Sequence, residues 1–143
     1  MNRPTRTASA VAAATVLIGT LATATPAEAA TPSVCGAGKW TVAARQAVKP
    51  GEIVLYKQKA SKNTMRVCGV YFNYSGKRQK MRVRMIAQPR PKGGMLTRKM
   101  GDETGNFRAY AGPLVGTVSK GVKVRVFGYP STHRGWNVVD VVV

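Results

Sequence analysis

Residues 79 to 85 of this chain, Gln-Lys-Met-Arg-Val-Arg-Met, alternate basic and apolar side chains one by one. Successive side chains of a β-strand point to opposite faces, so Lys80, Arg82 and Arg84 should share one face. The apolar residues between them, Met81, Val83 and Met85, should then face a core. A helix would scatter the same residues around its circumference. The stretch therefore predicts a strand with one buried face and one strongly basic face in solvent.

Similar period-two patterns recur along the chain, whereas no window of eleven or more residues after residue 30 shows a helical stripe. The predicted strands are Lys39 to Ala44, Glu52 to Gln58, Thr64 to Asn73, Gln79 to Ala87, Phe107 to Ala111, Leu114 to Val118, Val122 to Phe127 and Trp136 to Val143. Turn-forming residues such as Lys49-Pro50-Gly51 and Ser119-Lys120-Gly121 separate them. Eight short strands predict an all-β fold, a small antiparallel β-sandwich or barrel. Residues 43–48 could instead form a short helix that Pro50 would end.

Residues 88–106 are rich in glycine and proline and predict one long loop. Such a loop in a small domain is usually functional or mobile. It carries four basic residues together with Asp102 and Glu103, so it could be a basic flap or a solvated connection.

Residues 1–29 have the three parts of a secretory signal peptide. Arg3 and Arg6 form a positive start, residues 8–21 form an apolar core, and Ala27 and Ala29 suit a signal peptidase. The core is too short and too rich in alanine for a membrane span. Residues 30–143 are then one β domain, secreted to the medium or to the cell or spore surface, with no transmembrane segment after cleavage.

The chain has two cysteines, Cys35 and Cys68, both in the exported part. An oxidising compartment makes a disulfide between them the expected state. Closing that loop should stabilise the fold by roughly 3 to 4 kcal/mol. A metal pair or a reactive thiol is the alternative, but the chain has one histidine and no CxxC spacing. We therefore expect no metal and no cofactor.

Candidate catalytic groups are few. Residues 30–143 contain four carboxylates and one imidazole, which are Glu52, Asp102, Glu103, Asp140 and His133. No phosphate-binding loop, HExxH or GxSxG motif occurs. A hydrolase would have to pair Asp102 or Glu103 with Asp140 or Glu52, and nothing in their spacing favours this. We expect the carboxylates to pair with cations, and His133 to lie exposed in a polar turn, so no catalytic residue is predicted.

The basic residues give the clearest indication of function. Signal cleavage removes two of 23 basic and one of five acidic residues, which leaves a formal charge of +17. A second alternating stretch, residues 122–126, adds Lys123 and Arg125, and Lys77 and Arg78 precede the first. If the two strands were neighbours, five cations would share a face, and like charges opposed across strands would repel until an anionic ligand relieved them. Solubility and protection of sheet edges are the alternative explanation.

Short motifs resemble the secreted actinobacterial family typified by spore-associated protein A. The matching stretches are Cys35-Gly36-Ala37-Gly38, Ile53-Val54-Leu55-Tyr56, Thr64-Met65-Arg66-Val67-Cys68, residues 104–114 with Tyr110-Ala111-Gly112-Pro113 at their centre, and Gly121-Val122. That family often has a cysteine followed by Trp-Gly where this chain has residues 122–128, and its members are less basic. The resemblance implies a place on spores or in the medium and brings no catalytic residues.

The sequence thus predicts a secreted, non-enzymatic protein that binds anionic wall or spore-surface polymers through Lys80, Arg82, Arg84, Lys123 and Arg125, with Lys77 and Arg78 adding charge. Specific nucleic-acid readers interleave aromatic and basic residues, and Tyr71, Phe72 and Tyr74 do precede Lys77 and Arg78. Packing at a strand end explains Tyr71 and Phe72 equally well, so we expect nucleic acid to bind only non-specifically. Two alternatives stay open at this point. One is an antimicrobial or toxin that acts on competing cells, and the other is a secreted hydrolase or hydrolase inhibitor.

Overall fold

The computed structural model describes residues 32–89, 97–130 and 135–143. The predicted signal peptide and the segments 90–96 and 131–134, which include His133, lie outside these ranges. A single 3₁₀ turn precedes eight strands, in the order η1 (Pro32–Cys35), β1 (Thr41–Val48), β2 (Gly51–Lys59), β3 (Thr64–Asn73), β4 (Gln79–Gln88), β5 (Arg98–Phe107), β6 (Tyr110–Ser119), β7 (Lys123–Pro130) and β8 (Asn137–Val142). No helix in the described ranges is long and apolar enough to cross a membrane.

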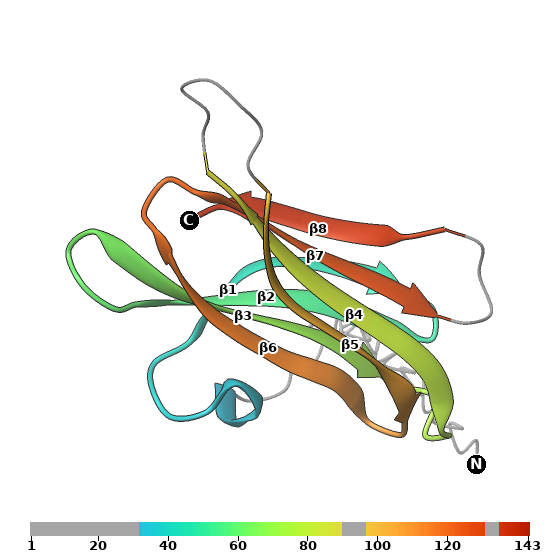
Figure 1. Ribbon diagram of the computed structural model, residues 1–143. Coiled ribbons are helices and arrows are strands. Elements are labelled where there is room, and N and C mark those ends of the chain that lie inside the picture. Colours follow the sequence, from blue (N-terminus) through green and yellow to red (C-terminus); the bar gives the residue numbers. More distant parts are fainter. Residues whose placement is uncertain (1–31, 90–96, 131–134) are drawn as a thin grey trace, which may run out of the picture.

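The strands form two antiparallel sheets of four strands each, with the orders β1-β2-β3-β6 and β5-β4-β7-β8. The sheets pack face to face, and Figure 1 shows β4 and β7 lying over β2 and β3. The predicted all-β sandwich is confirmed. The alternating residues of β4 behave as expected, since Met81, Val83 and Met85 are fully buried in the core. Their partners in that core come from both sheets and include Ile53, Leu55, Val67, Tyr71, Val124, Val126 and Val139.

One side of the sandwich is closed by a corner between β5 and β6. The two strands belong to different sheets but are joined by only Arg108 and Ala109, and they lie side by side in Figure 1. Gly101 permits this approach, because a Cβ atom there would lie 2.9 Å from Cδ2 of Leu114. The loop predicted at 88–106 is therefore wrong for residues 98–106, which form β5. Small residues here serve a close contact between strands and do not mark a loop.

Other strand boundaries differ from the prediction, and two of the differences change the element to which a segment belongs. Residues 43–48, the possible helix, belong to β1, because pairing with β2 satisfies their backbone groups. The strand predicted at residues 107–111 is interrupted by the corner, and its last two residues begin β6. The strand predicted at Thr64–Asn73 matches β3 at both ends.

The predicted disulfide joins Cys35 to Cys68 and fastens residues 32–40 across the outer side of β2 and β3. We refer to residues 32–40 as the N-terminal strap. Trp40 of the strap is buried, and its indole Nε1 donates a hydrogen bond to the carbonyl of Gly36 at 3.2 Å. Beneath the strap, a second apolar cluster contains Val54, Tyr56, Val70 and Phe72 together with both cysteines and Trp40. This sheet is therefore covered on both faces in the region of the strap.

The buried hydroxyl of Tyr71 allows a prediction about the stability of the core. Its side chain is fully buried, and its hydroxyl has no hydrogen-bond partner among the described residues. An unpaired buried hydroxyl costs about 1 to 3 kcal/mol, so Tyr71→Phe should raise the free energy of unfolding by about 1 kcal/mol or more. Urea titration at neutral pH measures this. A less stable variant would show that the hydroxyl has a partner, such as a buried water.

The same variant should change the stability at alkaline pH. Burial raises the pKa of Tyr71 to about 12 from its ordinary value of 10. Because the folded pKa is the higher one, the stabilisation is complete below pH 10 and is lost as the pH rises towards 12. Tyr71→Phe should therefore lose less stability than the wild type between pH 9 and pH 11.

Candidate anion-binding face

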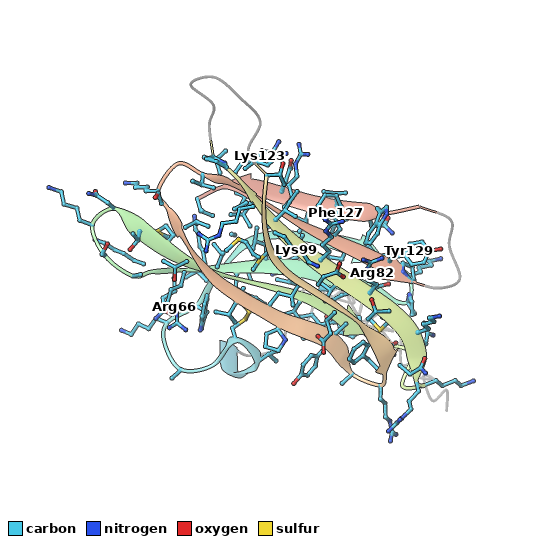
Figure 2. All side chains as sticks on the ribbon, viewed as in Figure 1. Arg66, Arg82, Lys99, Lys123, Phe127 and Tyr129 are labelled. Carbon is cyan, nitrogen blue, oxygen red and sulfur yellow. A yellow bond between two sulfur atoms is a disulfide. The ribbon has the colours of Figure 1, made fainter. Side chains whose placement is uncertain are left out.

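The structure brings the five predicted cations onto one surface. β4 and β7 are neighbours, and Lys80, Arg82, Arg84, Lys123 and Arg125 all lie on the outer face of the sheet, opposite to the core. Lys99 of β5 joins them through its contact with Asp102. We call this surface the cationic face, formed by Lys80, Arg82, Arg84, Lys99, Asp102, Lys123, Arg125, Phe127, Tyr129, Trp136 and Asp140. Figure 2 shows Lys99, Arg82, Phe127 and Tyr129 over this sheet, whereas Arg66 projects from the other one.

The register separates the cations of the two strands. Arg84 lies opposite Phe127, Arg125 lies opposite Ile86, and Lys123 lies opposite Gln88. The expected repulsion between directly opposed cations is therefore not found, because each cation meets an apolar, aromatic or amide side chain across the strand pair. Basic and apolar residues alternate both along and across the strands.

Asp102 of β5 holds two of the cations. Arg82 donates to it from Nε at 2.9 Å and from Nη2 at 2.7 Å, which is a bidentate pair, and Lys99 Nζ lies 3.6 Å away. These donors, Arg82 above all, lower the pKa of Asp102. The carboxylate therefore stays ionised at neutral and mildly acidic pH. It fixes Arg82 in place and leaves Arg84, on the same strand, free of any ion pair within the described residues.

Asp140 of β8 likewise pairs with two cations, at the other edge of the sheet. Lys123 Nζ lies 2.7 Å from Asp140 Oδ2, and this hydrogen bond is the main reason that the pKa of Asp140 is lowered. Arg125 Nε lies 3.5 Å from the same oxygen, too far for a good hydrogen bond but close enough for Coulombic attraction. Six cations and two carboxylates leave the cationic face with a formal charge of +4.

Lys77 and Arg78, also predicted to bind anions, lie apart from the centre of this face. They are exposed in the turn that precedes β4, where Ser75 and Asn73 bond to the backbone of Lys77. Lys123 pairs with Gln88 at the opposite end of β4, about 30 Å away along the strand. A ligand that touches both ends must be an extended polymer.

Three aromatic residues on the cationic face were not predicted as part of the site. The ring of Trp136 packs against Phe127 and Tyr129, with centroids 5.9 and 5.7 Å apart. The guanidinium of Arg82 lies over Trp136, 5.3 Å from its ring centroid. Phe127 and Tyr129 have the same parity as Lys123 and Arg125, so continuing the alternation of β7 would have placed them on this face.

Two hollows lie on the cationic face along β4. One, of about 190 Å³, is lined by Arg84, Ile86, Thr97, Phe127 and Trp136. The other, of about 400 Å³, is lined by Lys80, Met81, Arg82, Thr104 and Tyr129. Each hollow therefore combines at least one cation with at least one aromatic ring.

Each of the four carboxylates binds another group. Asp102 and Asp140 lie on the two edge strands of one sheet, whose backbones are about 14 Å apart, and each carboxylate binds cations. Glu103 accepts a hydrogen bond from the backbone amide of Gly112, and Glu52 accepts one from the hydroxyl of Tyr74. Across the described ranges, no three His, Cys, Asp or Glu side chains are grouped to hold a metal ion.

Comparison with known proteins leaves the cationic face as the main guide to function. No protein family model, no curated protein and no solved structure matches this chain.

Proposed function

We propose that this protein is a secreted, non-enzymatic binder of anionic polymers on a cell wall or spore surface, and that the cationic face is its binding site. The observation that carries the proposal is the charge on one face of a sheet, six cations against two carboxylates, with Arg84 and Lys80 outside any ion pair of the described residues. A polyanion would gain the Coulombic attraction of the whole face and release its counterions.

The arrangement of the face suits a linear polymer. Residues two apart on a strand are about 7 Å apart, so Lys80, Arg82 and Arg84 form a row of three charges at regular spacing. Solubility alone explains the alternation but not the excess of one sign, because a solubilising surface mixes acids with bases. The predicted signal peptide and the resemblance to the spore-associated protein A family support a ligand outside the cell.

The experiment that tests this proposal measures retention of residues 30–143 on purified Gram-positive cell wall over a series of salt concentrations. The wall is used intact and after chemical removal of its anionic polymers. We expect strong retention on intact wall at low salt, a steep loss as salt rises, and little retention on stripped wall.

Three other outcomes would contradict the proposal. Retention that survives both salt and stripping would point to recognition of the neutral glycan. Release of dye from anionic lipid vesicles without wall retention would favour a toxin. Absence of both would leave the charge as a determinant of solubility.

A further inference from the structure

The smaller hollow on the cationic face differs from the rest of that face in what surrounds its cation. Arg84 shares it with Ile86, Phe127 and Trp136, so most of the lining is apolar or aromatic. Its volume of about 190 Å³ is below the range of about 300 to 1,000 Å³ for pockets that hold drug-sized molecules. A site of this size suits one ring or one terminal group of a larger ligand.

Arg84, like Arg125, has a buried guanidinium nitrogen, Nε, without a hydrogen-bond partner among the described residues. Asp102 lies directly opposite on β5 and attracts Arg84 by its charge, but its oxygens accept hydrogen bonds from Arg82. A ligand cannot reach the buried Nε of Arg84, so an anion would pair with the terminal nitrogens of the guanidinium, and the partial burial of the cation strengthens that pairing.

The geometry of that cation suits a carboxylate or a phosphate. A guanidinium presents two parallel N–H donors to either group, which a lysine cannot do. The neighbouring indole of Trp136 is 44% exposed and lines the same hollow. Arg82 lies over one face of this ring, and the exposed remainder offers an apolar surface that the C–H face of a sugar ring can cover, with loss of water from both.

Building on the proposed function, we propose that the polymer is an acidic polysaccharide and that the Arg84–Trp136 hollow binds one of its uronic acid units. The carboxylate pairs with Arg84 and the pyranose ring packs on Trp136. A polyphosphate or a polyol phosphate chain satisfies the cations but offers no sugar ring to Trp136. The larger hollow, beside Lys80 and Arg82, then takes a neighbouring part of the same chain.

Three probes distinguish binding through charge alone from binding that also uses the sugar ring. They are a short oligogalacturonate, the same oligosaccharide with its carboxylates methyl-esterified, and inorganic polyphosphate. Binding to the wild type is measured by isothermal titration calorimetry and by the fluorescence of Trp136, with buried Trp40 on the other sheet as an internal reference. We expect the free acid to bind at least about 10-fold more tightly than the ester, because the ester cannot pair with Arg84.

Two variants test the roles of Arg84 and Trp136 in binding. Arg84→Lys keeps the charge but removes the fork of donors, and Trp136→Ala removes the ring surface. Each should weaken oligogalacturonate binding at least about 10-fold, whereas Trp136→Ala should weaken polyphosphate binding less than about 3-fold, because polyphosphate has no ring to pack on the indole. Both side chains lie on the outer face, and thermal unfolding verifies that each variant is folded.

The outcomes distinguish this inference from the proposed function. Equal losses for both anions in Trp136→Ala would overturn the uronic acid site and leave anion binding intact. Tight binding of the ester would show that no carboxylate is needed and would also overturn the uronic acid site. Failure of the wild type to bind either anion at low salt would overturn both.

Discussion

Changing Lys80, Arg82 and Arg84 together to glutamine should weaken retention on intact wall at low salt by on the order of 30-fold. It should also make the dependence on salt less steep by about three units, one for each anion contact that is lost. The reason is that these side chains form the continuous row of charge along β4, on the face opposite to the core. Retention measured over the same salt series as for the wild type gives both quantities.

The matched control removes the same charge elsewhere. Lys59, Lys62 and Lys120 are exposed at one end of the other sheet, where the amide of Lys120 bonds to the carbonyl of Asn63. Changing these three to glutamine lowers the net charge equally and should reduce retention much less. Equal losses in the two triple variants would show that total charge, and not the row on β4, governs binding. Circular dichroism verifies folding, since loss of Arg82 leaves Asp102 with Lys99 as its remaining cation.

The largest effect on stability is expected at the disulfide. Replacing Cys35 and Cys68 together by alanine should lower the free energy of unfolding by roughly 3 to 4 kcal/mol, because a loop of 33 residues is no longer closed in the unfolded chain. Urea titration at neutral pH measures the loss, and reduction of the wild type should reproduce most of it.

Binding should respond differently from stability in this variant. The strap lies on the sheet formed by β1, β2, β3 and β6, whereas the cationic face belongs to the other sheet. Wall retention of the folded variant should therefore stay within about 2-fold of the wild type, a margin that corresponds to well under 1 kcal/mol. A loss of stability below about 1 kcal/mol would mean that packing of Trp40 alone holds the strap.

Much of the fold follows from local patterns. β4 could be predicted from its strict alternation, and β3 from its run of β-branched and aromatic residues. β5 could not, because its sequence Arg-Lys-Met-Gly-Asp-Glu-Thr-Gly-Asn-Phe has the composition of a loop. It is a strand because β4 pairs along its whole length and because Gly101 lets Leu114 of β6 come close. These are contacts between distant residues, which local propensity does not contain.

The candidate site could likewise be predicted only in part, because local patterns do not contain the contacts between strands. Alternation places the basic residues of β4 and β7 on outer faces, but only the pairing of these strands places them side by side. The partners of the cations come from the edge strands, as Asp102 on β5 and Asp140 on β8, and their roles depend on sheet order. Trp136 precedes β8 and reaches Arg82 across β7, which no spacing in the sequence indicates.

The strict alternation of β4 also has a consequence for folding. A shift of this strand by one residue against its neighbours would turn Lys80, Arg82 and Arg84 into the core and expose Met81, Val83 and Met85. Burial of even one unpaired cation costs several kcal/mol, and exposure of the apolar side chains adds to this cost. The mispaired state is therefore much less stable than the correct one. The basic row would thus protect the correct strand alignment during folding, whether or not a ligand is present.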